Sequence, residues 1–556
     1  MNLLVFNWHE PFLHNLSKLG HQLHIVEPQA VSLNRIDGNY AWQTCYRPFP
    51  PNASDIRDLD SLRGVFLESK IDLAICLTYF DLALFKHFPA PKIYYPITPF
   101  RGGFEEMSPI EKQDAECYVS HLLENVFLAY SSQGMRQKDL GTSDKQHYLF
   151  NASNGVDLED YHSYDGEIPA VLRVGNRIQI RRTLNYPLQT QVLEGIPHLV
   201  LGTNPGMPNA RLSKDWDDLR MVLRKHRLFL SLYTPDFDLE TVEMSQLEAM
   251  ATGMPIVGTP HPGCLIEDGK NGFVSSDPEI LREKIMLLLK DRDLAVRLGE
   301  NARQTVAEKY GFEKYRKEWN QVLETVVSTR KGSKPSSQPK EKLVIQWEGP
   351  LTTGDAFGES NRKTIQSLHQ QGAFVIPSPK NEQIVVEHLM ANHFEGVKTL
   401  EVLGRGLSSP IRPSIRILSP FFQDSQVSEQ NNIAKTFAYF YCEQGSLPTR
   451  WVEHVKQDRI REVWVSSNME KRFYEAEGIP GERLAVVPRG VESSDSALDI
   501  ALELEGKFAL LYAGTTYSHD GGGHRASGLP ERVPIRGKDR FLVLFDRGVK
   551  GTARKA

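Results

Sequence analysis

The feature that most constrains the fold is an alternation of short apolar runs with amphipathic segments. The sequence predicts a strand at Leu3–Phe6, a helix at Glu10–Leu19 and a second strand at Gln22–Val26. The pattern restarts after Gly155, so two sets of about 160 residues predict two doubly wound, Rossmann-like α/β domains facing each other. Further strands are predicted at Ile71–Leu77, Lys92–Tyr95, Val126–Tyr130, Val171–Val174, His198–Leu201, Leu228–Leu232 and Pro255–Thr259, and further helices at Ser245–Ala251, Pro278–Lys290 and Ala295–Tyr310.

A linker divides the chain into two blocks. The stretch STRKGSKPSSQPKEK at Ser328–Lys342 has no apolar periodicity, so it cannot bury a core and is predicted to be flexible. We therefore predict domains at residues 1–150 and 151–327, a flexible linker at 328–342 and a second block from residue 343.

The second block repeats the spacing of the first. Ser132 and Gly155 are 23 residues apart, and so are Ser467 and Gly490. Each glycine precedes an apolar strand that ends in another glycine, VLRVG in the first block and FALLYAG in the second. An internal duplication is the simplest interpretation of this match.

The second copy is predicted to be incomplete. Too few residues follow FALLYAG to build another doubly wound domain, and the tail from His519 is rich in glycine and arginine without helical periodicity. We predict an additional N-terminal-type Rossmann-like domain at 343–500, and a truncated start of a second C-terminal-type domain with a basic tail at 501–556.

Composition and charge exclude several classes of protein. A net charge of −5 and a pI of about 6.4 give no overall basic field, so no nucleic-acid partner is expected. No apolar run reaches ~18 residues, so no membrane-spanning segment is expected, and the opening MNLLVFNWHEP lacks the basic region of a signal peptide. The five cysteines are odd in number, dispersed and without CxxC spacing, which argues against a disulfide framework or zinc site and favours the cytoplasm.

The stretch Leu228–Thr259 carries the most specific chemistry. It reads as a buried strand, an acidic loop, a helix, Gly253 as the helix C-cap and a further strand. Glu240 is predicted in the loop and Glu248 inside the helix. The helix N-terminus presents free N–H groups and a partial positive charge, which suits a diphosphate, while the carboxylates accept hydrogen bonds from sugar hydroxyls.

This stretch resembles the retaining glycosyltransferases of the GT-B fold, the large group 1 family. The resemblance rests on an E-x7-E motif, Glu240 to Glu248, followed by AMATGMPIV at Ala249–Val257. The segments Phe150–Asp157 and Ile266–Asp277 are also similar to family segments. The resemblance covers residues 1–327 and extends into the second block through WEGP, EQGSLPTRW and PRGVE.

The resemblance implies roles for the donor-side residues. Glu248 would hold the ribose hydroxyls of a nucleotide sugar, and Glu240 would contact the donor sugar near the reacting carbon. Arg181 matches the lysine of the family's V-G-R-x4-K-G pattern, with Arg177 beside the arginine position, and the basic pair would neutralise the leaving diphosphate. Thr241, in the donor-binding set, begins Thr-Val-Glu where the family has G-F-G. No metal or cofactor is implied.

The family's cleft histidine has no match in this chain. Thr78, Tyr79 and Arg101 are possible substitutes in the corresponding loops. His87 is predicted to be a surface histidine on a helix.

The acceptor side is predicted in the loop after the first strand, which ends at the carboxyl edge where ligands bind. Asn7, Trp8, His9 and Glu10 could stack on and hydrogen-bond an acceptor sugar. Alternatively, Trp8 packs in the core and His9 caps the following helix. The corresponding loop of the second block is Trp347–Pro350.

Together these features predict a cytoplasmic glycosyltransferase. It would move a sugar, with retention, from a nucleotide-diphosphate sugar to a glycan or lipid-linked acceptor in surface polysaccharide biosynthesis, with at most peripheral membrane contact. The alternative is a non-catalytic GT-B scaffold that binds a nucleotide sugar or glycan. The second block lacks an E-x7-E helix, and Ser518–Gly521 puts an acid where a cation is needed, so it is not expected to be an independent transferase.

Overall fold

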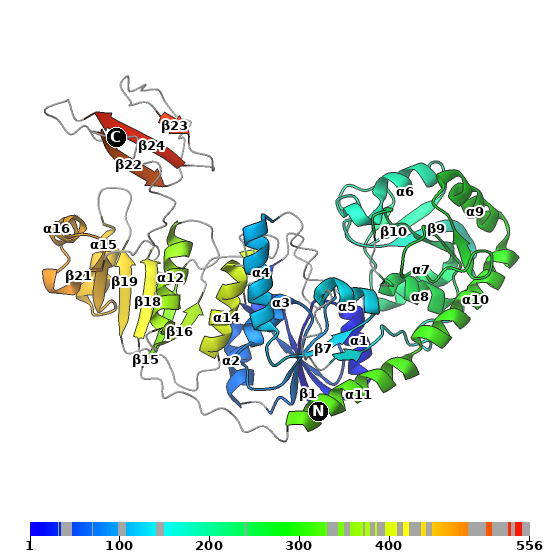
Figure 1. Ribbon diagram of the computed structural model, residues 1–556, viewed down its shortest axis with the longest axis horizontal. Helices are drawn as coiled ribbons and strands as arrows, with labels where there is room; N and C mark the ends of the chain where they lie inside the picture. Colours follow the sequence, from blue (N-terminus) through cyan, green and yellow to red (C-terminus); the bar gives the residue numbers. More distant parts are fainter. Residues whose placement is uncertain are drawn as a thin grey trace. The chain divides into compact units, whose positions relative to one another are not determined.

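A computed structural model gives the fold of the chain (Figure 1). The chain forms two compact units, residues 1–340 with 382–411 and residues 341–381 with 412–556. The structure describes residues 1–31, 33–34, 47–68, 70–97, 107–140, 149–237, 240, 242–330, 343–349, 356–370, 373–378, 384–385, 395–407, 415–421, 435–440, 447–487, 507–513, 532–534 and 540–546.

The first sheet of the first unit is parallel throughout, with the strand order β4-β2-β1-β5-β6-β7-β8 among the described residues. Its central strand β1 pairs Leu3 with Leu23 on one side and with Leu73 on the other. All three leucines are buried because helices cover both faces of the sheet. The strands are β1 (Asn2–Phe6), β2 (Gln22–Val26), β4 (Ala53–Ile56), β5 (Leu73–Cys76), β6 (Lys92–Tyr94), β7 (Phe127–Tyr130) and β8 (Leu149–Asn151), and the helices are α1 (Glu10–Ser17), α2 (Leu59–Glu68), α3 (Tyr79–Phe85), α4 (Pro109–Leu122) and α5 (Gln133–Leu140).

The second sheet is also parallel, with the order β11-β10-β9-β12-β13-β14. The prediction of two doubly wound α/β domains is therefore confirmed, and so is Gly253 as a C-cap, because it ends its helix in the left-handed region at φ 98°. The strands are β9 (Ile168–Val174), β10 (His198–Leu201), β11 (Ala210–Arg211), β12 (His226–Ser231), β13 (Ile256–Gly258) and β14 (Gly272–Val274), and the helices are α6 (Tyr186–Val192), α7 (Trp216–Lys225), α8 (Met244–Thr252), α9 (Pro278–Lys290) and α10 (Arg292–Tyr310).

The helix α11 (Phe312–Arg330) returns to the first sheet. Its Tyr315, Trp319 and Leu323 are fully or almost fully buried in the same apolar cluster as Leu3 of β1. The sequence-based division assigned this segment to the domain of the second sheet, yet its apolar face completes the core of the first.

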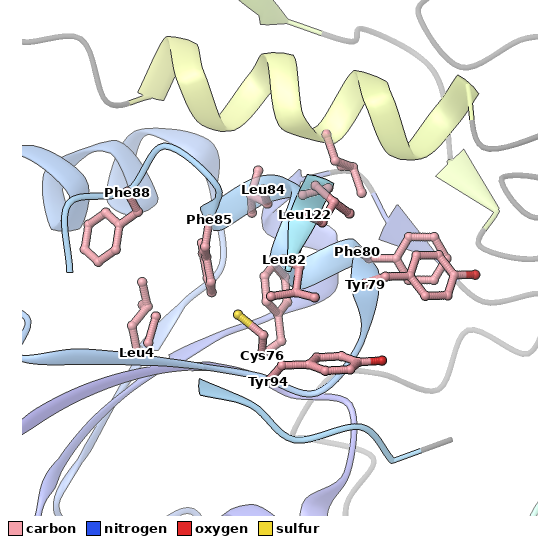
Figure 2. Close-up of a cluster of buried hydrophobic side chains, with 14 of the residues drawn as sticks. Leu4, Cys76, Tyr79, Phe80, Leu82, Leu84, Phe85, Phe88, Tyr94 and Leu122 are labelled. Atoms are coloured by element: carbon pink, nitrogen blue, oxygen red, sulfur yellow. The ribbon is translucent and has the colours of Figure 1, made fainter. Parts of the chain in front are cut away.

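A helix from beyond the linker also joins the first unit. The helix α14 (Glu395–Leu407) packs on α3, and Figure 2 shows it, in yellow, passing over the cluster that contains Leu84 and Leu122. Its buried Val397, Leu400, Leu403 and Leu407 follow helical spacing, so they form one apolar face. A short parallel pair, β3 (Leu33–Asn34) with β17 (Ile384–Val385), lies in the same unit.

The contact between α14 and α3 depends on Gly404. A Cβ atom at Gly404 would lie 1.7 Å from the carbonyl oxygen of Leu84. We expect Gly404→Ala to push the helices apart and to lower the free energy of unfolding of the first unit by about 1–3 kcal/mol in urea titrations. Gly64→Ala in α2 is the control, because a Cβ there meets nothing within 4 Å. The control should be neutral or stabilising by about 0.5–1 kcal/mol. Equal effects of both substitutions would contradict the close helix contact.

The second unit contains a parallel sheet of order β16-β15-β18-β19-β20-β21. This order matches β2-β1-β5-β6-β7-β8 of the first sheet, so the two sheets share one topology, although the tandem duplication itself stays a prediction. Gly490, which supported it, lies outside the described residues. The elements are β15 (Leu343–Glu348), α12 (Ala356–Gln370), β16 (Ala373–Ser378), β18 (Ile415–Phe421), β19 (Thr436–Phe440), α15 (Thr449–Lys456), β20 (Glu462–Val465), α16 (Asn468–Ala476) and β21 (Leu484–Val486).

Two expectations for the second block differ from the structure. Trp347 and Glu348 lie in β15 rather than in a loop, because the pairing of β15 with β16 and β18 continues through both residues. Glu348 also forms a buried ion pair with Arg416 of β18, at 2.6 and 2.7 Å. The strand β22 (Lys507–Ala513), expected to start a parallel donor-type domain, pairs antiparallel with β24 (Arg540–Asp546), which also pairs with β23 (Arg532–Pro534).

Within the described part of the chain, no helix is both long and apolar enough to cross a membrane. Cys76, Cys117 and Cys264 are free thiols, while Cys45 and Cys442 lie outside the described residues.

Candidate functional site

The predicted donor motif has the expected local structure. Glu240 lies in the loop after β12, and Glu248 lies inside α8. Glu243 occupies the N-cap position of α8 without a side-chain capping hydrogen bond, and the adjacent Val242 is buried. Thr241 lies outside the described residues.

Glu248 is a buried carboxylate with a cationic partner. Its exposed fraction is 5%, and its Oε1 accepts a short hydrogen bond from Nη2 of Arg47. Burial raises the pKa of Glu248, whereas the guanidinium of Arg47 and the hydroxyl of Tyr161 oppose that rise. Glu248, which was expected to hold the ribose, therefore forms an ion pair with a residue of the first domain.

Arg47 brings the two halves of the predicted site together. Its backbone N–H donates to Oε1 of Glu10 at 2.5 Å, and its Nη1 lies 3.4 Å from Oε2 of the same carboxylate. Its Nη2 also donates to the Tyr161 hydroxyl at 3.0 Å, and the guanidinium lies 4.7 Å from the ring centroid of Trp216. Burial lowers the pKa of Arg47, but Glu248, Tyr161 and Glu10 raise it more, so the guanidinium stays charged. Sequence analysis missed Arg47, Tyr161 and Trp216, because no motif marks residues that meet across two domains.

Glu240 also contacts the first domain. Its Oε2 accepts a hydrogen bond of 2.7 Å from the backbone N–H of Gly134, in the first turn of α5. A carboxylate at a helix N-terminus is electrostatically favourable. The side chain of Glu240 is exposed, unlike that of Glu248.

The predicted basic pair lies on a tight turn after β9. Arg177 has a left-handed backbone at φ 53°, donates from its N–H to the carbonyl of Thr203 at 2.8 Å, and accepts at its own carbonyl from the N–H of Arg181 at 3.0 Å. Arg181 is exposed and precedes a short 3-10 helix, Arg182–Leu184. The turn thus presents Arg181 at the carboxyl edge of the second sheet.

Three aromatic residues that sequence analysis missed gather at the same edge. Tyr233 and Phe237 follow β12 and stack at 4.3 Å, and His261, which follows β13, lies 4.6 Å from Tyr233. Burial lowers the pKa of His261 to about 4, so its ring is neutral near pH 7. Burial raises the pKa of Tyr233, and the charge of Glu243 raises it further, whereas the charge of Arg181 acts in the opposite direction. Their positions just after neighbouring parallel strands were the available signal.

A buried arginine, Arg173 of β9, hydrogen-bonds segments next to this edge. Its Nη2 donates to the carbonyl of Leu232 at 3.1 Å and to the carbonyl of Leu184, and its Nη1 donates to Oε1 of Gln189. Burial, together with the charge of Arg181, lowers the pKa of Arg173 to about 10, while Glu243 acts in the opposite direction.

The predicted acceptor residues separate into two groups. Asn7 is buried and donates to Oε1 of Glu27 at 3.0 Å, and Trp8 packs on aromatic rings and donates to Asp81. Burial raises the pKa of Asp81 to about 7, and the hydrogen bond from Trp8 opposes this rise. These two side chains point into the first domain, as the packing alternative for Trp8 anticipated.

His9 and Glu10, in contrast, join the Arg47 cluster. His9 occupies the N-cap position of α1 but forms no side-chain capping bond. Burial and nearby Arg47 lower the pKa of His9 to about 4, so its imidazole is neutral near pH 7.

The residues weighed as substitutes for a cleft histidine have other surroundings. Thr78 is the N-cap of α3, and Tyr79 is buried in its first turn. Arg101 lies outside the described residues. His87, expected on a helix, follows the end of α3, and its Nε2 lies 3.2 Å from Oε1 of Glu401 in α14.

Comparison with known proteins finds a family match to one segment of the chain. The family model described as glycosyl transferases group 1 matches residues 212–305. That range contains the loop with Glu240 and the helix with Glu248, and it excludes Arg177 and Arg181.

Two curated relatives match short segments of the chain. An uncharacterized glycosyltransferase of Methanocaldococcus jannaschii is 33% identical over 88 residues, which cover 15% of this chain and 22% of the relative. The poly(ribitol-phosphate) alpha-N-acetylglucosaminyltransferase of Staphylococcus aureus is 33% identical over 81 residues, which cover 14% of this chain and 16% of the relative. The chain thus spans about a fifth of the length of these relatives.

Two solved structures have a partial likeness to this chain. Sucrose-phosphate synthase from Thermosynechococcus elongatus has 14% identity and a TM-score of 0.44, covering 59% of this chain and all of that one. HepE of Anabaena, solved with UDP and glucose, has 12% identity and a TM-score of 0.43, covering 58% of this chain and all of that one.

Proposed function

We propose that this chain, whose residues 212–305 belong to the group 1 glycosyltransferase family, transfers a sugar from a nucleotide-diphosphate sugar to an acceptor. The observation that carries the proposal is the E-x7-E pair inside the family segment, with one carboxylate in the loop and the other inside α8. Arg181 lies at the same sheet edge, which supports a donor with a negatively charged leaving group.

Each donor group has a complementary partner in this proposal. Glu248 accepts hydrogen bonds from the ribose hydroxyls, and Glu240 faces the sugar near the reacting carbon. Arg181 and Arg177, with the N-terminus of α8, neutralise the charge that develops on the diphosphate as the glycosidic bond breaks. A leaving-group oxygen then accepts the proton of the acceptor hydroxyl. We propose retention of configuration and no metal requirement on the same basis.

The acceptor is proposed to be a glycan or lipid-linked glycan of surface polysaccharide biosynthesis. The name of the Staphylococcus aureus relative, which specifies a poly(ribitol-phosphate) acceptor, supports a polymer of this kind. The acceptor would approach the edge of the first sheet near His9 and Glu10. A cytoplasmic location and at most peripheral membrane contact remain part of the proposal.

A second candidate is a non-catalytic protein that binds a nucleotide sugar or glycan. It is favoured by the engagement of both motif carboxylates within the protein, Glu240 by Gly134 and Glu248 by Arg47. The sequence Thr-Val-Glu in place of G-F-G also favours it.

Calorimetric titration of the full chain with UDP, GDP, ADP, CDP and dTDP tests the donor site. We expect one nucleotide to bind saturably, and Glu248→Gln to weaken it about 10- to 100-fold, because a hydrogen bond to a charged group is lost. Glu300→Gln, at an exposed position of α10, is the control and should bind as the unaltered chain does. No binding to any nucleotide by folded protein would contradict the donor site.

Turnover separates the two candidates. With the corresponding nucleotide sugars, Glu240→Gln should retain nucleotide binding and lose transfer if the chain is an enzyme. A chain that binds the nucleotide but transfers no sugar to any glycan or lipid-linked acceptor would support the non-catalytic candidate.

A further inference from the structure

We infer that Arg47 is a positioning residue, supplied by the first domain, that orients Glu248 for the donor and links it to Glu10 on the acceptor side. This inference rests on the proposed function, because it assigns a role to a residue next to the donor carboxylate. Arg47 lies outside the family segment at 212–305, and none of the motifs includes it.

The geometry fixes the guanidinium in one place. Arg47 has an exposed fraction of 4%, and its side chain is held by Glu248, Glu10 and the Tyr161 hydroxyl. The indole of Trp216 covers it at 4.7 Å, so both its plane and its position are defined. A lysine ammonium cannot reproduce this arrangement, because it lacks the planar fork that contacts several acceptors at once.

The charges around Glu248 make Arg47 the decisive partner. The groups that act on the Glu248 carboxyl are Arg47, Tyr161, Glu10 and Asp160. Asp160 is itself paired, with Nζ of Lys18 at 2.6 Å and Nε2 of His14 at 2.9 Å. Arg47 is therefore the direct cationic partner of Glu248 among the described residues, and its removal leaves a buried carboxylate facing further acidic groups.

A buried carboxylate without a cation takes up a proton, which changes what it can bind. Ionised Glu248 only accepts hydrogen bonds, which suits the two hydroxyls of a ribose, whereas the protonated form donates one. By keeping Glu248 ionised, Arg47 preserves its complementarity to the donor. Since the same guanidinium contacts Glu10, an acceptor bound at Glu10 can alter donor affinity through Arg47.

The test compares nucleotide affinity across pH in the full chain. We would titrate the five nucleoside diphosphates into the unaltered chain and Arg47→Gln between about pH 5.5 and about pH 8.5. For the nucleotide that binds, Arg47→Gln should weaken affinity about 10-fold or more at the acidic end and progressively less as the pH rises, because Glu248 becomes ionised again. The double variant Arg47→Gln/Glu248→Gln should lose this additional pH dependence, which a purely structural role of Arg47 would not predict.

Two further variants distinguish a specific effect of Arg47→Gln from misfolding. Arg47→Lys keeps the charge and loses the fork, so it should bind more weakly than the unaltered chain but without the additional pH dependence. Arg57→Gln removes an exposed arginine just after β4 and should leave binding unchanged.

The outcomes separate this inference from the proposed function. If the unaltered chain binds none of the nucleotides, the proposed function fails. If it binds one, but Arg47→Gln binds equally well or more tightly at every pH, the inference is overturned while the proposed donor site stands.

Discussion

Replacing Arg181 with alanine should lower kcat for sugar transfer about 100- to 1,000-fold, the loss typical when one preorganised donor to developing negative charge is removed. Arg181 is exposed at the carboxyl edge of the second sheet, where its charge is available to a ligand. Nucleotide affinity should fall much less than kcat, because the charge on the leaving diphosphate grows mainly in the transition state.

The neighbouring arginine provides a matched control. Arg182 has a side-chain exposure of 87%, and its Nη2 lies 3.0 Å from Oδ2 of Asp236. Steady-state transfer assays of Arg182→Ala should therefore give kcat close to that of the unaltered chain, since an exposed pair contributes little. Equal kcat values for Arg181→Ala and the unaltered chain would remove Arg181 from the diphosphate site.

Truncating Trp319 should cause the largest loss of stability, about 3–5 kcal/mol in the free energy of unfolding of the first unit. Trp319 of α11 is fully buried, and its ring centroid lies 5.3 Å from that of Phe12 and 4.9 Å from that of Tyr95. Trp319→Ala leaves a cavity between α11 and the first sheet, so the packing of α11 on this sheet should be lost first as the protein unfolds.

Urea unfolding followed by circular dichroism measures this loss. Trp319→Phe is the control and should cost clearly less, because it keeps an aromatic ring and the indole N–H of Trp319 has no hydrogen-bond partner among the described residues. A loss below about 1 kcal/mol in Trp319→Ala would mean that α11 does not stabilise the first domain.

Local patterns were sufficient to predict most elements of the first block. The predicted β2, β10 and α9 have the same bounds in the structure, because period-2 and period-3.6 apolar patterns end there at turn or capping residues. The positions of Glu240 in a loop and Glu248 in a helix followed for the same reason, since Gly253 and Pro255 end the helix locally.

Contacts between distant segments were not predictable in this way. The helix α14 has an apolar face that the sequence displays, but nothing local shows that α3 covers it. The donor and acceptor roles proposed for Glu248 and Glu10 came from separate motifs, whereas their link through Arg47 joins residues 201 positions apart in one case. Asn7 and Trp8 were predicted to lie in a ligand-binding loop. In the structure their side chains turn inward, where Asn7 donates a hydrogen bond to Glu27 and Trp8 donates one to Asp81.

The sequence by itself determined the α/β class, the succession of strands and helices along the chain, and the placement of Glu240 in a loop and Glu248 in a helix, because these depend on patterns within a few turns. Only the tertiary structure decided which helices complete the first core, which residues of the loop after β1 turn inward and which cation pairs with Glu248. The physical reason is that burial and charge pairing act through space. A carboxylate's partner is set by which side chains the packed domains bring within hydrogen-bonding distance, and no local pattern encodes that distance.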